Sequence, residues 1–137
     1  MTSISKKIYF ASDQHFGAPT PELSFPREQK FVAWLDEVKK DAEAIFLLGD
    51  LFDFWFEYKT VVPKGFVRVL GKLAEIRDSG IPIYFFVGNH DLWMNDYFEK
   101  ELNIPVFHEN QEYTFHGKTF LVGHGDGKGP GDLGYKR

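Results

Sequence analysis

Segments typical of buried strands alternate with segments typical of helices, and this alternation constrains the fold of the chain more than any other feature. Short apolar segments lie at residues 6–12, 44–48 and 81–88. Amphipathic segments at residues 24–42 and 63–80 separate them. Such an alternation predicts an α/β protein with a largely parallel sheet.

Local signals predict where the two long helices begin and end. Ser24 is a candidate N-cap with Pro26 in the first turn, and Gly80 is a stop signal for the second helix. Apolar side chains at helical spacing are expected to face the core: Phe31, Trp34, Leu35 and Val38 in the first helix, and Phe66, Leu70, Leu73 and Ala74 in the second.

The remainder of the chain predicts a short helix and a hairpin. The helix is expected at residues 95–102, and the hairpin at residues 112–123 with its turn at His116 and Gly117. The length of 137 residues predicts one domain.

Composition excludes several classes of protein. The chain has no cysteine, which excludes disulfides and thiolate metal sites. Its net charge of −4, with lysine and arginine scattered, argues against a nucleic-acid partner. The sequence shows neither a signal peptide nor an apolar run of transmembrane length, so a cytoplasmic location is predicted.

Polar residues follow each predicted strand at the point where it ends. In parallel α/β sheets, ligands bind beyond the carboxyl ends of the strands. Carboxylates, imidazoles and an amide together form a ligand set that suits manganese, iron or zinc better than calcium. The residues in question are, in chain order, Asp13, His15, Asp50, Asn89, His90, Asp91 and His124.

Each of these motifs alone has an ordinary structural explanation. The D-x-H pattern also fits a turn with a surface histidine, the "GD" pair also fits a turn or helix cap, and "HGD" also fits a glycine loop. Their repeated position behind strands favours one shared site. His108 and His116 lack this context and are interpreted as a surface and a hairpin-turn histidine.

The order D-x-H, GD-x-x-D, GNHD and a later histidine resembles the calcineurin-like metallophosphoesterase superfamily. The resemblance implies the N-terminal part of an αββα layered sandwich with two divalent cations, manganese being expected and iron or zinc the alternatives. It implies that Asp13 and His15 hold one cation and that Asp50 bridges both. Asn89 and His124 would hold the second.

The same resemblance implies roles at the substrate phosphate. Asn89 and His90 would contact it, and His90 would stabilise charge or protonate the leaving group. Asp91 would orient His90. The cation pair would activate a water for in-line attack on phosphorus.

Two longer segments are similar to those of the UDP-2,3-diacylglucosamine pyrophosphatases, a group within that superfamily. These segments are "IYFASDQHFGAP" and "GHGDGKGPGDLGYK", and the second adds Asp132 as a substrate contact. The implied reaction cleaves a UDP-linked diacyl sugar to 2,3-diacylglucosamine 1-phosphate and UMP in lipid A biosynthesis. A generic phosphodiesterase or phosphatase, and a non-catalytic scaffold or fragment, are the alternatives.

The chain departs from the superfamily pattern in one respect. A further G-H-x-H motif is expected downstream, and the sequence reaches Arg137 without it. We therefore expect residues 1–137 to form a single domain that is incomplete at its C-terminus, with reduced or no activity. An exposed apolar sheet face is then expected to favour self-association.

The aromatic run Phe52, Phe54, Trp55 and Phe56 has two interpretations. It contacts acyl chains or a membrane surface, or it packs beneath the metal loop, and packing is the favoured interpretation because aromatics more often serve cores. The first interpretation implies a peripheral position on the inner face of a bacterial inner membrane.

Overall fold

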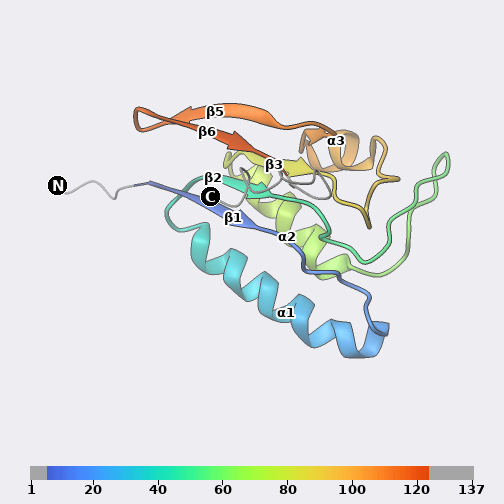
Figure 1. Cartoon of the computed structure of the whole chain (residues 1–137). Coiled ribbons are helices and arrows are strands. Elements are labelled where there is room, and N and C mark those ends of the chain that lie inside the picture. Colours follow the sequence, from blue (N-terminus) through green and yellow to red (C-terminus); the bar gives the residue numbers. More distant parts are fainter. Residues whose placement is uncertain (1–5, 124–137) are drawn as a thin grey trace.

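The computed structural model describes residues 6–123, which form three layers (Figure 1). The central layer is a parallel sheet in the order β1-β2-β3-β4. Its strands are β1 (Lys7–Ala11), β2 (Ala42–Leu47), β3 (Ile83–Phe86) and β4 (Val106–Phe107). The predicted α/β architecture with a mostly parallel sheet is confirmed.

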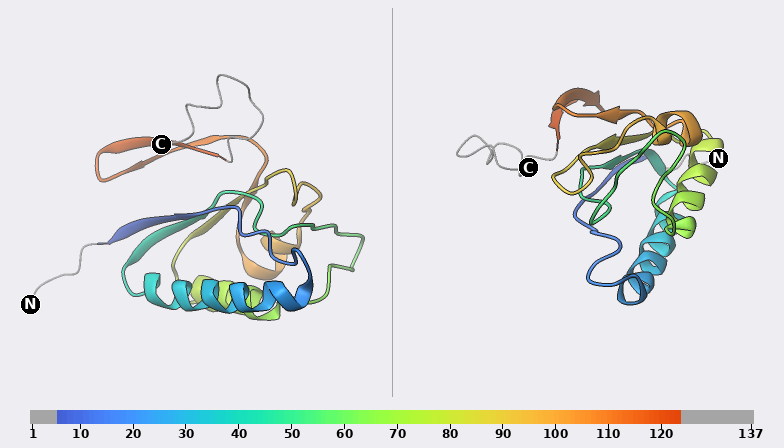
Figure 2. Two further views of the ribbon diagram at one scale, coloured as in Figure 1. Left: turned by 60° about the horizontal axis from the view of Figure 1, so that its bottom comes forward. Right: turned by 90° about the vertical axis from the view of Figure 1, so that its right-hand side faces the viewer.

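Three helices connect successive strands and cover one face of the sheet (Figure 2). They are α1 (Pro21–Val38), α2 (Val67–Asp78) and α3 (Tyr97–Leu102). Because each connection steps to the next strand in one direction, the loops that leave the carboxyl ends of β1, β2 and β3 lie next to one another.

The start of α1 differs from the prediction. Thr20 is the N-cap, and its hydroxyl accepts a hydrogen bond from the backbone N–H of Leu23 at 3.2 Å. The prediction of Ser24 as N-cap was wrong, because Ser24 lies buried inside the helix, where its hydroxyl accepts from the N–H of Gly17 at 2.7 Å. A cap signal alone does not separate two hydroxyl residues four positions apart.

Other boundaries shift by a few residues. Helix α1 ends at Val38 rather than at residue 42, and α2 begins only after Phe66, which has a left-handed φ of 61°. Gly80 follows the end of α2 with a φ of +102°, as its predicted role as a stop requires. Strand β4 was not predicted, because its two residues carry too little pattern.

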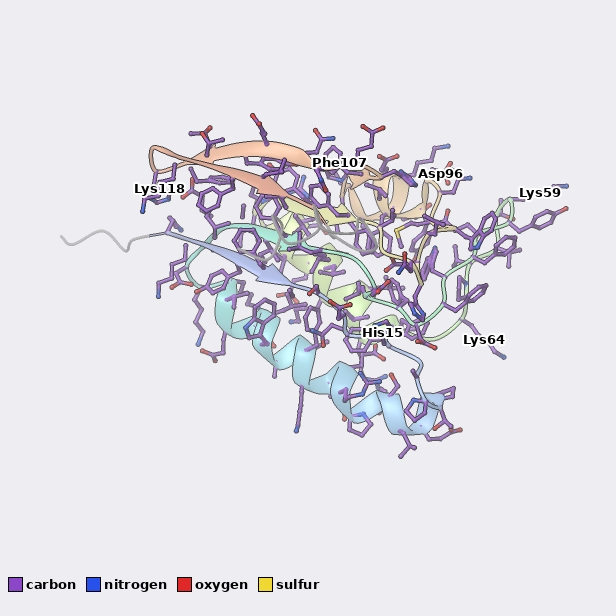
Figure 3. All side chains as sticks on the ribbon, viewed as in Figure 1. His15, Lys59, Lys64, Asp96, Phe107 and Lys118 are labelled. Atoms are coloured by element: carbon purple, nitrogen blue, oxygen red, sulfur yellow. The ribbon has the colours of Figure 1, made fainter. Side chains whose placement is uncertain are left out.

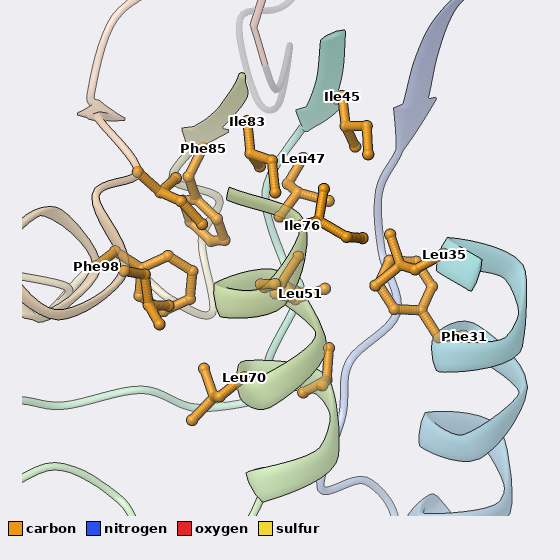
Figure 4. Packing of buried hydrophobic residues seen from close by; sticks show 14 of the residues in the cluster. Phe31, Leu35, Ile45, Leu47, Leu51, Leu70, Ile76, Ile83, Phe85 and Phe98 are labelled. Carbon is orange, nitrogen blue, oxygen red and sulfur yellow. The ribbon is translucent and has the colours of Figure 1, made fainter. Parts of the chain in front are cut away.

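The main core lies between the helices and the sheet (Figure 4). Buried there are Phe31, Leu35 and Val38 of α1, Val69, Leu70, Leu73 and Ile76 of α2, Ile45 and Leu47 of β2, and Ile83 and Phe85 of β3. Trp34, Phe66 and Ala74, which were also expected to face inward, are only partly buried.

An antiparallel hairpin covers the other face of the sheet (Figure 1). It consists of β5 (Gln111–Phe115) and β6 (Lys118–Val122), and its turn lies at His116 and Gly117 as predicted. The ring of Tyr113 packs at 4.9 Å from that of Phe46 in β2. The two sheets thus share a second, aromatic core.

Candidate metal centre

The loops that follow β1 and β2 run side by side and are joined by backbone hydrogen bonds. The N–H of Asp13 donates to the carbonyl of Gly49 at 3.0 Å, and the N–H of His15 donates to the carbonyl of Asp50 at 2.9 Å. These bonds bring Asp13, His15 and Asp50 together although Asp50 lies 35 residues beyond His15.

All three residues have a left-handed backbone. Their φ angles are 60° for Asp13, 50° for His15 and 54° for Asp50. This conformation costs a residue other than glycine about 1–2 kcal/mol. Such strain persists only where the surroundings enforce it, and it concentrates at functional sites.

The side chains of these residues converge on one point. Nε2 of His15 lies 3.7 Å from Oδ1 of Asp13 and 3.8 Å from Oδ2 of Asp50. One ligand atom from each of the three lies within 4.8 Å of the others. Figure 3 shows His15 just beyond the carboxyl end of β1, where ligands of parallel sheets are expected.

Asp53 and His90 extend this cluster, and Asp53 was missed as a site residue from the sequence. Nδ1 of His90 lies 2.8 Å from the carbonyl oxygen of Asp53 and 3.4 Å from its carboxylate. The carboxylate of Asp53 also lies 3.4 Å from Nδ1 of His15, and the two imidazole rings are 4.6 Å apart. The signal was present as the second aspartate of GD-x-x-D.

The environment of His90 favours its charged form. The hydrogen bond to the Asp53 carbonyl raises the pKa of His90, and the carboxylates of Asp50, Asp53 and Asp91 act in the same direction. Partial removal from water opposes them.

Asp91 contacts backbone groups of two loops rather than the His90 ring. Its fully buried carboxylate accepts hydrogen bonds from the backbone N–H groups of Gly88, Leu51 and Asp50 at 2.7, 2.9 and 3.2 Å. The expectation that Asp91 orients His90 was wrong, since the carboxylate against that ring belongs to Asp53. Burial raises the pKa of Asp91, while its three N–H donors act to lower it.

Gly88 allows the loop after β3 to approach Asp50. A Cβ atom at Gly88 would lie 2.3 Å from Oδ1 and 2.7 Å from the backbone nitrogen of Asp50. The same Oδ1 accepts a hydrogen bond from the N–H of His90 at 2.8 Å. Residue 88 must therefore be glycine, because any side chain there would collide with Asp50.

The other predicted residues lie in varied places. Asn89 is exposed between Gly88 and His90. His108 is exposed, as expected of a surface histidine. His116 lies in the hairpin turn as predicted, and its Nε2 is 2.7 Å from Oε1 of Glu43 in β2. His124 and Asp132 lie outside the described residues.

The aromatic run divides between the two interpretations. Phe52 and Trp55 are fully buried in the main core, as the packing interpretation predicts. Phe54 and Phe56 instead point outward, with 61% and 44% of their surface exposed.

The cluster fits a divalent cation chemically. Asp13, Asp50 and Asp53 supply carboxylate oxygens, and His15 and His90 supply imidazole nitrogens. Asp50 is only 4% exposed, and a charge so well buried needs neighbours of opposite sign. Oxygen and imidazole ligands together suit manganese, iron or zinc.

Comparison with known proteins identifies the family. The sequence profile of the calcineurin-like phosphoesterases matches residues 6–134. The chain belongs to this family. As a calcineurin-like phosphoesterase it has hydrolases as relatives, and the family implies divalent metal ions.

Similar proteins carry the name UDP-2,3-diacylglucosamine hydrolase. One from Porphyromonas gingivalis is 47% identical over 120 residues, which cover 88% of this chain and 46% of that protein. One from Haemophilus influenzae (strain PittGG) is 31% identical over 96% of this chain and 54% of its own length. A third, from Edwardsiella ictaluri, is 30% identical over 93% of this chain and 48% of its own length. The chain thus spans about half the length of the curated relatives it matches.

No helix within residues 6–123 combines the length and the apolar character that crossing a bilayer requires.

Proposed function

We propose that this calcineurin-like phosphoesterase hydrolyses the pyrophosphate bond of UDP-2,3-diacylglucosamine, releasing 2,3-diacylglucosamine 1-phosphate and UMP for lipid A biosynthesis, and that residues 1–137 alone do so at a reduced rate. The convergence of Asp13, His15 and Asp50 within 4.8 Å of one another is the observation that carries the reaction type. The names of the similar proteins support the substrate.

Different residues of the chain would bind the two ions. Asp13 and His15 would bind one ion, Asp50 would contact both, and Asn89 with His124 would bind the second. Mn²⁺ is the ion we propose. When bound, the ions would polarise the phosphoryl oxygens and lower the pKa of an attacking water.

His90 would act on the leaving group. Its Nδ1 donates to the Asp53 carbonyl, which leaves Nε2 as the nitrogen to face a phosphate oxygen. The hydrogen bond to the Asp53 carbonyl raises the pKa of His90, which favours the protonated ring whose Nε2–H would stabilise charge or supply a proton. Asp132 would contact the sugar nucleotide.

The proposed roles are tested with three variants, His90→Ala, Asp50→Ala and His116→Ala, each assayed in the presence of Mn²⁺. UMP release from UDP-2,3-diacylglucosamine is followed by ³¹P NMR, and bound manganese is measured by metal analysis. His90→Ala should lower the rate about 10²–10⁴-fold and retain metal, as expected for a lost general acid. Asp50→Ala should lose metal and activity together, and His116→Ala, outside the cluster, should lose neither.

Two results would contradict the proposal. Equal, small effects of His90→Ala and Asp50→Ala would refute the assigned roles. Hydrolysis of a small chromogenic phosphodiester without cleavage of the UDP-sugar would refute the substrate and favour a generic phosphodiesterase.

We further propose a peripheral contact with the inner face of the inner membrane. Exposed apolar side chains lie on the loops after β2 and β3: Phe54, Phe56, Tyr58, Val61 and Trp93. The rings of Phe56 and Trp93 lie 6.1 Å apart, which joins the two loops. Lys59 lies at the outer tip of the loop (Figure 3), and its ammonium is 5.3 Å from the Tyr58 ring centroid.

This composition suits a bilayer surface that holds an acylated substrate. Tryptophan and tyrosine favour the membrane interface, and lysine is attracted to anionic lipid. The chain should sediment with anionic vesicles, and Trp93→Ser with Phe54→Ser should abolish this. Leu23→Ser on α1, where Leu23 is 62% exposed, is the matched control. Equal sedimentation of both variants would contradict the proposed contact.

A further inference from the structure

The inward face of α1 changes character along the helix. Toward the C-terminal end it is apolar, with Phe31, Leu35 and Val38 in the core. One and two turns earlier the same face presents the polar residues Ser24, Arg27 and Glu28, which we call the polar end of α1. A core-facing position selects polar residues only where they find hydrogen-bond partners.

Arg27 binds the loop that carries Asp13 and His15. Its guanidinium donates to the backbone carbonyl of Gln14 at 2.5 Å and to that of His15 at 3.4 Å. It also donates to the carbonyl of Ala18. One planar side chain therefore joins both ends of the segment from residue 14 to residue 18.

The neighbours of Arg27 complete the attachment. The hydroxyl of Ser24 accepts from the N–H of Gly17 in the same loop at 2.7 Å. The buried carboxylate of Glu28 accepts from the N–H of Val69 at 3.1 Å, which fixes the start of α2 against α1. Within residues 6–123, all three side chains thus form their hydrogen bonds with backbone groups.

We infer that Arg27 is a positioning residue for the metal centre, and that it holds the D-x-H loop in the strained shape that presents Asp13 and His15 to a cation. The left-handed φ angles of these two residues need surroundings that enforce them. Backbone hydrogen bonds to Gly49 and Asp50 in the loop after β2 hold the D-x-H loop through its N–H groups, and Arg27 holds it through its carbonyl groups. The five-donor fork of arginine suits this task, because lysine offers no planar arrangement that reaches separated carbonyls.

The inference rests on the proposed function for its metal readout, so the experiment has two arms. The first arm measures hydrogen exchange of residues 13–18 in metal-free protein. Arg27→Met should raise exchange there while β2 and β3 keep their protection. Lys30→Met, one turn along the exposed side of the same helix, should leave both unchanged.

The second arm measures Mn²⁺ affinity from the electron paramagnetic resonance signal of free Mn²⁺. Arg27→Met should weaken binding about 10–100-fold, as is usual for residues that orient ligands. Millimolar guanidinium added to Arg27→Ala should restore part of the affinity, whereas sodium at equal ionic strength should not. A merely structural residue would show no such rescue.

The outcomes separate the inference from the proposed function. If the wild-type chain bound no Mn²⁺, the proposed function would fail, and the exchange arm alone would decide the role of Arg27. Unchanged exchange of residues 13–18 in Arg27→Met, or wild-type Mn²⁺ affinity in that variant, would overturn the inference.

Discussion

Gly88 occupies the closest approach between the loops that follow β2 and β3. Its missing side chain leaves room for the carboxylate and backbone nitrogen of Asp50. The GNHD motif predicts polar ligands after β3 but no role for Gly88 itself. A spatial requirement of this kind becomes visible only when both loops are placed.

Gly88→Ala should destabilise the fold by about 1–3 kcal/mol, because the added methyl group overpacks a closed contact. It should also displace Asp50 and weaken Mn²⁺ binding. Gly71→Ala is the matched control, since nothing lies within 4 Å of a Cβ there and the site is an exposed position in α2. That control should stabilise by about 0.5–1 kcal/mol, and urea denaturation measures both. Equal free energies of unfolding for the two variants would contradict the packing argument.

Asp91 binds the backbone of both loops rather than the His90 ring. Asp91→Ala should leave the N–H groups of Gly88, Leu51 and Asp50 buried without their acceptor, at about 1–3 kcal/mol for each unsatisfied group. Thermal unfolding should therefore shift strongly downward. Asp53→Asn, at a half-exposed position that contacts His90, should change unfolding little. A stable Asp91→Ala protein with a selective loss of turnover would restore the orienting role.

At the scale of elements, the hairpin β5–β6 owes its position to aromatic packing on β2 and β3. Tyr113 packs on Phe46 and on Tyr84 at 4.9 and 5.2 Å. The turn and the strands were predictable from alternation and from the His-Gly pair. The sheet face that the hairpin covers was not predictable. The periodicity of a strand shows which side chains share a face, but not which surface that face packs against.

The pKa of Tyr113 gives this contact a pH dependence. Burial, together with the neighbouring Tyr84, raises the pKa of Tyr113 from 10.0 to about 12. The neutral phenol is favoured in the fold, so its contribution to stability is complete below pH 10 and is lost as the pH rises through 12. Denaturation midpoints measured from pH 9 to 12 should fall, and Tyr113→Phe should flatten that fall. An identical slope in the variant would show that the phenol is not buried by the hairpin.

The elements also show why some predictions succeeded. The spacing of apolar residues predicted β1, β2, β3, α1 and α2, because each of these elements buries one face or both. The polar end of α1 and the pairing of Asp53 with His90 escaped, since both depend on contacts between segments distant in the sequence.

At the scale of the whole molecule, apolar surface is distributed unevenly. Within the described residues the helices cover one sheet face and the hairpin lies over the other, yet Phe10 on the edge strand β1 and Leu121 on β6 are exposed. The predicted self-association through the sheet side stays a prediction. Light scattering after size exclusion should show a mass above the 15.9 kDa monomer, and Phe10→Ser should reduce it. A monomer at high concentration would refute self-association.

The whole molecule thus delivers residues from three separate loops to one edge of its parallel sheet, and the proposed function requires a divalent cation to bind there. Anomalous diffraction at the manganese absorption edge, from crystals of the chain grown with Mn²⁺, tests this most directly. We predict a peak bounded by the carboxylates of Asp13 and Asp50 and by Nε2 of His15. Manganese bound elsewhere, with none at this edge, would refute the proposed metal centre.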